Sequence, residues 1–172
     1  MVFLTKPCLM HLCNMYQTIN NHINSHIKTS EKELKVFNAS LNEIALTKGQ
    51  FLLKPGTHVK HEYFVVKGCL KAYYTDSKGN QHIIQFAIEN WWVGDFAAFY
   101  NQVPSELFIE AIEDSQLLSM HYDSLQKIYE KAPIFERYFR ILTTQAFIAQ
   151  RKRILSTLEK HTQERYLEFC QT

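Results

Sequence analysis

The most distinctive chemical candidate in the sequence is an acidic residue placed directly before a short aromatic segment. Asp95 follows Gly94 and precedes FAAFY (residues 96–100), which predicts one helical turn. An aspartate there can accept hydrogen bonds from the first backbone N–H groups of the helix, so its simplest role is that of an N-cap. Trp91 and Trp92 stand just before it and could stack on a flat ligand, although paired aromatic residues in a strand more often belong to the core.

A second group of candidates consists of metal-ligating side chains, and their spacing does not favour a metal site. His58, His61 and Glu62 read His-x-x-His-Glu, whereas cupins, the metal-dependent jelly rolls, need His-x-His with a later Glu and a second histidine further along. His22 and His26 have the spacing of a helical metal pair, but no third ligand stands nearby. We expect no metal and no cofactor. No nucleophile–base pair, phosphate-cradling loop or pair of catalytic carboxylates can be assigned, so we expect no enzyme.

The cysteines indicate a reducing compartment. Cys8, Cys13, Cys69 and Cys170 form no CxxC pair and are too sparse for a secreted disulfide scaffold. Two cysteines near the N-terminus are also too few to hold an iron–sulfur cluster. No apolar run approaches the ~20 residues that a membrane span needs. We therefore expect reduced thiols in a cytoplasmic protein without a membrane partner.

Length and charge limit the architecture. With 172 residues, 46% of them hydrophobic and 21% charged, the chain can bury one ordinary core plus an appended element. A formal charge of +2 neither requires nor excludes a nucleic-acid partner. Residues 1–14 are apolar but interrupted by Lys6-Pro7, and no cleavage site of a signal peptide follows. We interpret them as an N-terminal extension, with Met15 as the natural start.

The middle of the chain predicts a small β-barrel or jelly roll. All five glycines lie between positions 49 and 94, each where one β-segment passes to the next. The segments are rich in Phe, Tyr, Val and Ile, and residues 76–80 have hairpin-turn chemistry. Short strands at this regular spacing favour a closed double-sheet architecture. The predicted strands are IALTK, QFLLK, YFVVK, CLKAYYT, QHIIQFAI, FIEAI and QLLSMHY.

Helical patterns flank these strands. Residues 16–41 lack glycine and proline and carry apolar residues three, four or seven apart, which predicts two short amphipathic helices. Ser30 and Glu33 predict a capping box at the start of the second one. Pro133 opens a long segment that reaches Phe169 without another proline or a glycine, and proline is well suited to a first helical turn.

The long C-terminal segment also carries a repeat typical of paired helices. Ile134, Ile141, Ile148 and Leu155 recur every seven residues, and Leu142 lies beside this stripe. We favour dimerisation over packing of the helix on its own barrel, because the stripe is longer than one small barrel. The basic run at residues 151–153 is interpreted as a solvated helical face rather than a phosphate contact.

The stretches GQFLLKPG, YFVVKGCLKAYYTDSKGNQHIIQFAIENWWVGDF and PSELFIEAIEDSQLLSMHYDSL resemble the cyclic-nucleotide-binding-type effector domain of the Crp/Fnr family, in its Bacteroidetes-like branch. The resemblance runs from about Ile44 to about Arg165. It implies an α+β fold with N-terminal helices, a double-stranded β-roll (jelly roll) of about eight strands and a long C-terminal dimerisation helix. We divide the chain into an extension (1–14), N-terminal helices (15–43), the β-roll (44–122) and C-terminal helices (123–172).

The resemblance also implies a ligand pocket, from which this sequence departs. In the family a Gly-acid pair introduces a short helix, the acid binds a ribose hydroxyl, and backbone N–H groups receive the cyclic phosphate. An arginine about ten residues later completes phosphate binding, yet Ser105 and its neighbours stand there. No lysine or arginine occurs from Gly79 to Gln126, so a phosphate would meet an acidic neighbourhood. The candidate ligand-binding residues are Trp91, Trp92, Gly94, Asp95, Phe96, Ala97 and Ser105, and we expect no tight binding of cAMP.

These observations predict the effector-sensing and dimerisation domain of a Crp/Fnr-type transcription regulator. Its expected partners are a second copy of the chain and an unknown small-molecule effector. In the family a helix-turn-helix follows the long helix, and the sequence ends at Thr172 without room for one. We therefore expect DNA contact only through a helix-turn-helix absent from this chain. The alternative is a stand-alone β-roll that binds a small ligand or a protein partner; a cupin-like enzyme is the least favoured.

Overall fold

The computed structural model describes residues 6–159, and it describes side chains from Met15 onward. The chain divides into two units, Met1–Pro133 and Ile134–Thr172. Within residues 6–159 there are eight strands and five helices, four of the helices in the first unit and one in the second. None of these helices combines the length and apolar character that crossing a membrane requires.

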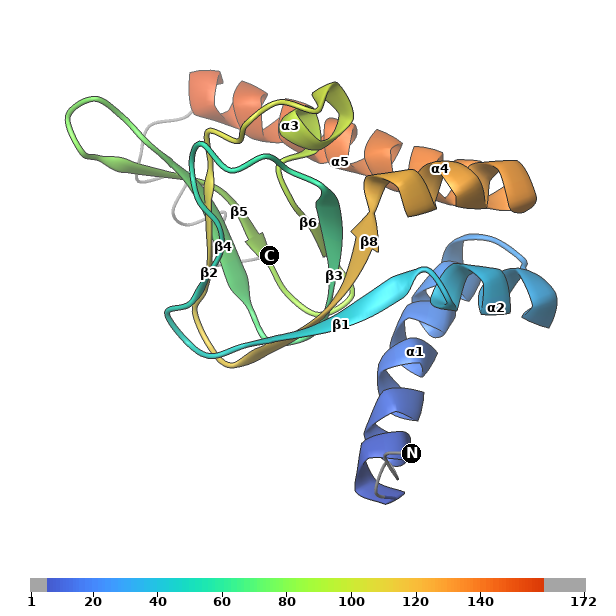
Figure 1. The fold of residues 1–172 in the computed structure, drawn as a ribbon. Helices are drawn as coiled ribbons and strands as arrows, with labels where there is room; N and C mark the ends of the chain where they lie inside the picture. The colour runs from blue at the N-terminus through green and yellow to red at the C-terminus, as the bar shows by residue number, and fades with distance from the viewer. Residues whose placement is uncertain (1–5, 160–172) are drawn as a thin grey trace. The chain divides into compact units, whose positions relative to one another are not determined.

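The first unit is built around two four-stranded antiparallel sheets (Figure 1). The sheet that we call the β3 sheet has the order β1 (Leu41–Leu46), β8 (Ser115–His121), β3 (His61–Lys67) and β6 (Trp92–Val93). The β4 sheet has the order β2 (Phe51–Leu53), β7 (Phe108–Ala111), β4 (Leu70–Thr75) and β5 (Gln81–Ala87). Strands that follow one another along the chain repeatedly belong to opposite sheets, which is the connectivity of a jelly roll. The α+β roll expected from the glycine spacing is thus confirmed.

Both faces of the β3 sheet are buried where its central strands β3 and β8 pair. Val65 and Leu117 are paired across β3 and β8 and are fully buried on one face. Phe64 and Leu118, the pair on the opposite face, are equally buried, and the ring of His22 from α1 (Lys6–His26) lies 5.3 Å from that of Phe64. A sheet covered on both faces needs nearly continuous apolar strands. This explains why YFVVK and QLLSM show little alternation.

The N-terminal helices agree with the sequence in their capping but not in their limits. α2 (Glu31–Asn38) has the predicted capping box, in which Glu33 N donates to Ser30 Oγ at 3.3 Å and Ser30 N donates to Glu33 Oε2 at 2.7 Å. α1 is a helix of 21 residues rather than a short one, and it begins at Lys6, well before Met15.

The prediction that Leu41 ends the second helix was wrong. Leu41 is the first residue of β1, where it is buried opposite Met120 of β8. Its helical spacing from Phe37 is real, but pairing with β8 satisfies its backbone and buries its side chain at once. Tertiary contacts therefore override the local helical pattern at this residue.

The first unit contains two further helices. α3 (Phe96–Asn101) lies between β6 and β7 in the chain, and α4 (Tyr122–Lys131) follows β8. The second unit contains α5 (Ile134–Glu159), which begins immediately after Pro133 as predicted. Ile148 and Leu155 of the seven-residue repeat remain 49% and 37% exposed on α5. The basic run at 151–153 is exposed as well. The predicted continuation to Phe169 lies outside the described residues.

Gly68 is indispensable to the turn between β3 and β4. Its φ of +99° is one that L side chains rarely adopt, and a Cβ there would lie 2.8 Å from Ser115 Cα in β8. We expect Gly68→Ala to lower the free energy of unfolding by about 2–5 kcal/mol, from backbone strain of ~1–2 kcal/mol plus overpacking of ~1–3 kcal/mol. Urea denaturation measures this loss.

Gly79 offers a matched control for this prediction. It also has a positive φ, +86°, but a Cβ there would meet nothing within 4 Å. Gly79→Ala should therefore cost only the backbone strain, about 1–2 kcal/mol. Equal losses for the two variants would contradict the idea that Ser115 leaves no room beside Gly68.

Candidate effector site

The predicted ligand site before and within α3 centres on Asp95. We call the segment from Gly94 through α3 to Ser105 the α3 cassette. The two residues of β6 lead through Gly94 to Asp95, whose carboxylate Oδ1 accepts a hydrogen bond from Ala98 N at 3.0 Å. Asp95 is therefore the N-cap of α3, the role that its residue type most simply predicts. Gln102 ends the helix in the left-handed conformation. The carboxylate is buried, so the cap belongs to the interior of the roll rather than to its surface.

Ser105 closes the cassette from the opposite side. Its hydroxyl donates to Asp95 Oδ2 at 2.7 Å and accepts a hydrogen bond from Leu107 N at 2.9 Å. Its backbone is held as well, because Ser105 N donates to Thr57 O and Gly56 N donates to Ser105 O. Both oxygens of the Asp95 carboxylate are thus engaged by groups of the chain itself. A ligand that needs this acid must compete with two existing hydrogen bonds.

A second buried acid lies against the start of the cassette. Glu62 of β3 stands beside Gly94, and a Cβ on Gly94 would come within contact distance of the Glu62 carboxylate. Glu62 Oε1 is buried and has no hydrogen-bond partner among the described residues. Burial first, and the neighbouring Asp95 carboxyl second, raise the pKa of Glu62 to about 8. Near neutral pH the side chain therefore exists mainly as the uncharged acid.

Residues 43–132 match the family model described as "Cyclic nucleotide-binding domain". This segment is more than half of the chain and covers nearly all of the jelly roll. The chain belongs to this family. Within the family it is a domain of the Crp/Fnr type, as the curated relatives below indicate.

One similar protein is the "Fumarate and nitrate reduction regulatory protein" of Vibrio cholerae. It is 27% identical over 124 residues, which are 72% of this chain and 49% of the relative. The chain thus spans about half the length of the curated relatives that it matches.

Two solved structures share the fold of this cyclic nucleotide-binding domain. The sensor domain of the transcriptional regulator DNR from Pseudomonas aeruginosa superposes with a TM-score of 0.65 at 17% identity, over 88% of this chain and 97% of that one. A cyclic nucleotide-binding domain from Methylobacillus flagellatus gives 0.69 at 14% identity, over 89% and 87%. At such identities the likeness concerns the fold alone.

The candidate ligand residues fall into two groups in the structure of this domain. Asp95 and Ser105 are brought together, and Gly94 lies beside them. Trp92 is half-buried in β6 with its ring 5.6 Å from that of Phe64, which agrees with the interpretation as core. Trp91 is 49% exposed and Phe96 is 52% exposed, and Ala97 is exposed too, so these three side chains are not enclosed with the acid.

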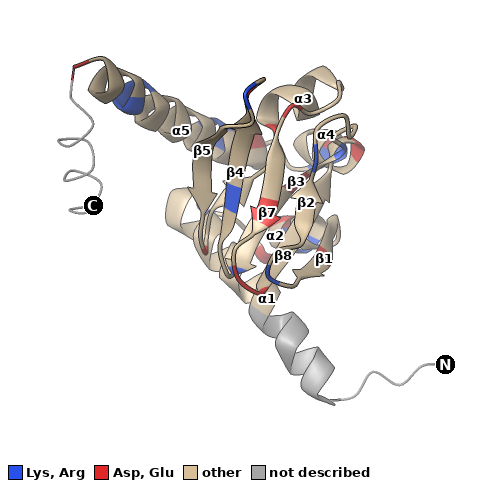
Figure 2. Cartoon of the chain, turned by 90° about the vertical axis from the view of Figure 1, so that its left-hand side faces the viewer, with Lys and Arg blue, Asp and Glu red and all other residues tan. Residues whose placement is uncertain are grey.

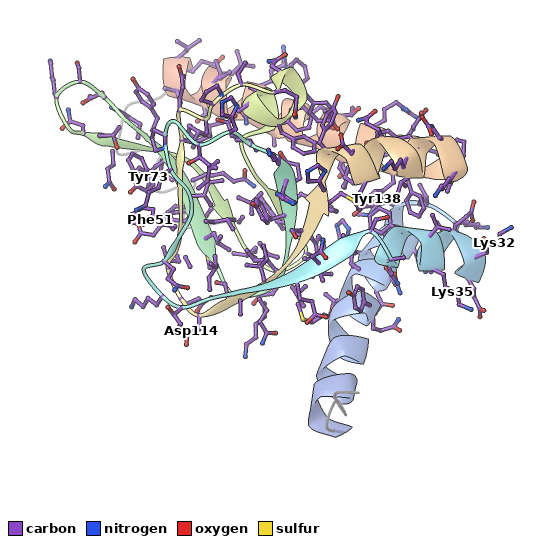
Figure 3. All side chains as sticks on the ribbon, in the orientation of Figure 1. Lys32, Lys35, Phe51, Tyr73, Asp114 and Tyr138 are labelled. Carbon is purple, nitrogen blue, oxygen red and sulfur yellow. The ribbon has the colours of Figure 1, made fainter. Side chains whose placement is uncertain are left out.

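Lys71 of β4 is already engaged in an ion pair. It lies on the outer face of the β4 sheet, where its Nζ is 3.1 Å from Glu110 Oε2 and 5.0 Å from the centroid of the Tyr73 ring. Figure 2 shows a basic segment of β4 beside an acidic segment of β7. Tyr73 and Phe51, labelled in Figure 3, belong to the same outer aromatic layer. Lys71 therefore does not supply the cation that is missing from the cassette.

The histidines considered as metal ligands do not lie together in one cluster. His58 forms an isolated bridge with Pro104, whereas His61 is paired with His121 across β3 and β8, with ring centroids 4.9 Å apart. His22 and His26 share a face of α1 as predicted, and burial, followed by the charge of His26, lowers the pKa of His22 to about 4. In the part of the chain that the structure describes, no three His, Cys, Asp or Glu side chains gather as a metal site requires.

Sequence reasoning missed the role of Glu62. It considered this residue only together with His58 and His61, as part of a metal motif. The sequence does contain a sign that Glu62 is buried. Glu62 is two positions before Phe64 in the same strand, so the two side chains lie on the same face of the sheet. An acid in a core-facing position of a strand is rare and points to a special environment.

Proposed function

We propose that this domain is the effector-sensing and dimerisation part of a Crp/Fnr-type transcription regulator, and that it is not a tight cAMP binder. Support for a sensing role comes from the α3 cassette, which stands where the family receives its ligand. In a regulator of this type, ligand binding shifts an equilibrium between arrangements of the dimer and thereby of the DNA-binding helix-turn-helix domains. DNA contact is assigned to such a domain, not to the β-roll.

The expectation that cAMP binds only weakly rests on the hydrogen bond between Asp95 and Ser105. In nucleotide-sensing relatives the acid and an arginine both face the ligand; here the corresponding side chains bind each other at 2.7 Å. A guanidinium would hold a phosphate through two charge-assisted hydrogen bonds. A hydroxyl that already donates to a carboxylate offers a phosphate no further proton.

The remaining attraction for a cyclic phosphate is small. The N-terminus of a helix is worth about 0.3–1 kcal/mol for an exposed anion and ~2 kcal/mol in favourable geometry. One of the backbone N–H donors at the N-terminus of α3 is already occupied, because Ala98 N donates to Asp95. The buried carboxylate of Asp95 also stands close by and opposes a second negative charge.

Calorimetric titration of the 172-residue chain with cAMP and cGMP at moderate salt tests this proposal. We expect dissociation constants of about 1 mM or weaker, a level with little regulatory use. A micromolar constant for either nucleotide would contradict the proposal and would require a cation from outside the segment between Gly79 and Gln126. Native mass spectrometry of the purified protein complements the titration, because a co-purifying small molecule identifies the effector class directly.

Support for dimerisation comes from α5 taken by itself. Its repeat of apolar residues leaves Ile148 and Leu155 substantially exposed, and Phe147, Ile154 and Leu158 are more exposed still. Isolated exposed apolar residues are ordinary, but a contiguous set along one helix marks an interaction surface. A second copy of α5 has the matching repeat and covers the same stripe.

A further inference from the structure

The strongest unexplained feature of the domain is the Glu62 carboxyl buried beneath the start of α3. A glutamate is almost never fully buried unless it is paired, because desolvation penalises its charged form. Glu62 is only 8% exposed, its Oε1 is unpartnered among the described residues, and the carboxyl group that acts on it is that of Asp95. No step of the proposed function uses this side chain.

The groups around Glu62 come from three elements. Asp95 lies at the N-terminus of α3, and Tyr100 lies in α3 itself, next to Tyr122 and Tyr129 of α4. Tyr63 is its neighbour in β3. Burial and the proximity of Glu62 raise the pKa values of Tyr63 and Tyr100, so these phenols stay neutral whenever Glu62 titrates. The environment therefore contains one further carboxyl group and neutral hydroxyl groups.

Gly94 makes the contact between Glu62 and the cassette possible. Its backbone has no positive φ, so it is not required by the turn itself. Instead, a Cβ at this position would lie 2.6 Å from the carboxyl carbon of Glu62, closer than real Cβ atoms approach. The carboxyl group thus occupies the space that any other residue at position 94 would fill. Glu62 and the residue before the N-cap of α3 are packed as one unit.

We propose that Glu62 is a proton switch for α3: the neutral acid packs against Gly94 and lets Asp95 cap the helix, whereas loss of its proton repels Asp95 and loosens the helix start. The proton passes to solvent, and the only charged group that acts on the remaining carboxylate, among the residues that the structure describes, is the Asp95 carboxyl. β3 cannot yield, because it is paired with β8 on one side and β6 on the other. We therefore expect the short link from β6 to α3 to move instead. This switch operates whether or not an effector binds, so it does not depend on the proposed function.

The direction of the pH effect on stability follows from proton linkage. Between the ordinary glutamate value of 4.5 and the raised pKa of about 8, the folded chain retains a proton that the unfolded chain has released. Stability from this group is therefore complete below pH 4.5, falls as the pH rises through this window, and changes no further above it. One such proton can raise the equilibrium constant for unfolding by at most ~10-fold per pH unit.

Glu62→Gln is the decisive variant, because glutamine has nearly the shape of the neutral acid and cannot ionise. Urea denaturation across the window should show a stability difference between wild type and Glu62→Gln that grows with pH, since other titrating groups cancel in the comparison. Glu43→Gln is the matched control: Glu43 is an exposed glutamate in β1 of the same sheet, and its substitution should leave the pH dependence unchanged. A pH-independent difference for Glu62→Gln would overturn the proposal.

Hydrogen exchange of the Ala98 amide reports on the helix start itself. This N–H donates to Asp95, so its exchange should be equal in wild type and Glu62→Gln at about pH 6 and severalfold faster in wild type at about pH 9. Comparison at equal pH removes the intrinsic rise of exchange with base. If exchange at Ala98 keeps the same ratio at both pH values while global stability changes, Glu62 is only a buried acid and the proposed action on α3 is wrong.

The contact with Gly94 is tested separately by a double-mutant cycle. Gly94→Ala alone should lower the urea midpoint, because its methyl group meets the carboxyl group of Glu62. In a Glu62→Ala background the same methyl group enters vacated space, and the shift should largely disappear. Additive effects of the two substitutions would show that the two residues are not packed as one unit.

Discussion

Lysine at both Ile141 and Ile148 should convert a dimer of this chain into monomers. Both side chains belong to the seven-residue repeat of α5, and Ile148 is 49% exposed on the helix. Each isoleucine buried in a partner interface contributes about 1.5–3 kcal/mol, and the two-fold arrangement counts every change twice. Placing four ammonium groups there costs more. We expect the dissociation constant to rise by a factor of at least ~1000, which sedimentation velocity at micromolar concentration resolves.

Thr143 and Gln150 supply the matched control for this substitution. Each stands two residues after one of the isoleucines, about 200° further around the helix, and both are exposed. Lysine at these two positions adds the same charges to the opposite side of α5 and should leave the dimer intact. If the Ile141→Lys, Ile148→Lys variant still sediments as a dimer, the interface lies elsewhere. If both double variants dissociate, charge on α5 rather than the apolar stripe is responsible.

Arginine in place of Ser105 should make this domain bind cyclic nucleotides measurably. The substitution removes the hydroxyl that donates to Asp95 Oδ2 and puts a guanidinium where the family resemblance leads us to expect one. A hydrogen bond to a charged group is worth roughly 1.5–3 kcal/mol, so the dissociation constant for cAMP should fall about 10- to 100-fold. Calorimetry under the conditions used for the wild type measures the change.

Two comparisons separate a phosphate contact from other effects of this substitution. Ser105→Gln adds bulk without charge and should not improve cAMP binding. Adenosine lacks the phosphate, so its affinity for the arginine variant should stay that of the wild type. An arginine variant that binds cAMP no better than the glutamine variant would mean that the cassette lacks the family's ligand geometry. A gain for adenosine equal to that for cAMP would point away from the phosphate.

Local sequence rules predicted most of the β-roll correctly. Gly68 stands at the junction of β3 and β4 with a positive φ, and the turn at residues 76–80 closes as a hairpin through hydrogen bonds accepted by Asp76 from Lys78 N and Asn80 N. These features depend on residues next to each other in the chain. The same holds for the capping box of Ser30 and Glu33, which forms as the sequence indicates.

The limits of elements were harder to predict where two structures suit the same residues. Leu41 fits both the spacing of a helix and that of a strand, and its pairing with Met120, far away in sequence, decides for the strand. α1 extends further toward the N-terminus than its apolar pattern indicated. In both cases the local preference is small, and the outcome depends on packing partners that the local pattern does not contain.

The sequence by itself determined the jelly-roll architecture, the position of the Asp95 cap before α3 and the lack of cations from Gly79 to Gln126, because periodicity, turn chemistry and composition are local properties. Only the tertiary structure decided that Ser105 donates to Asp95 and that Glu62 shares its space with Gly94. These pairs join separate segments of the chain, and the roll brings them within contact distance. The protonation state of Glu62 follows from that enclosure, since desolvation is a property of the folded core and not of the residue.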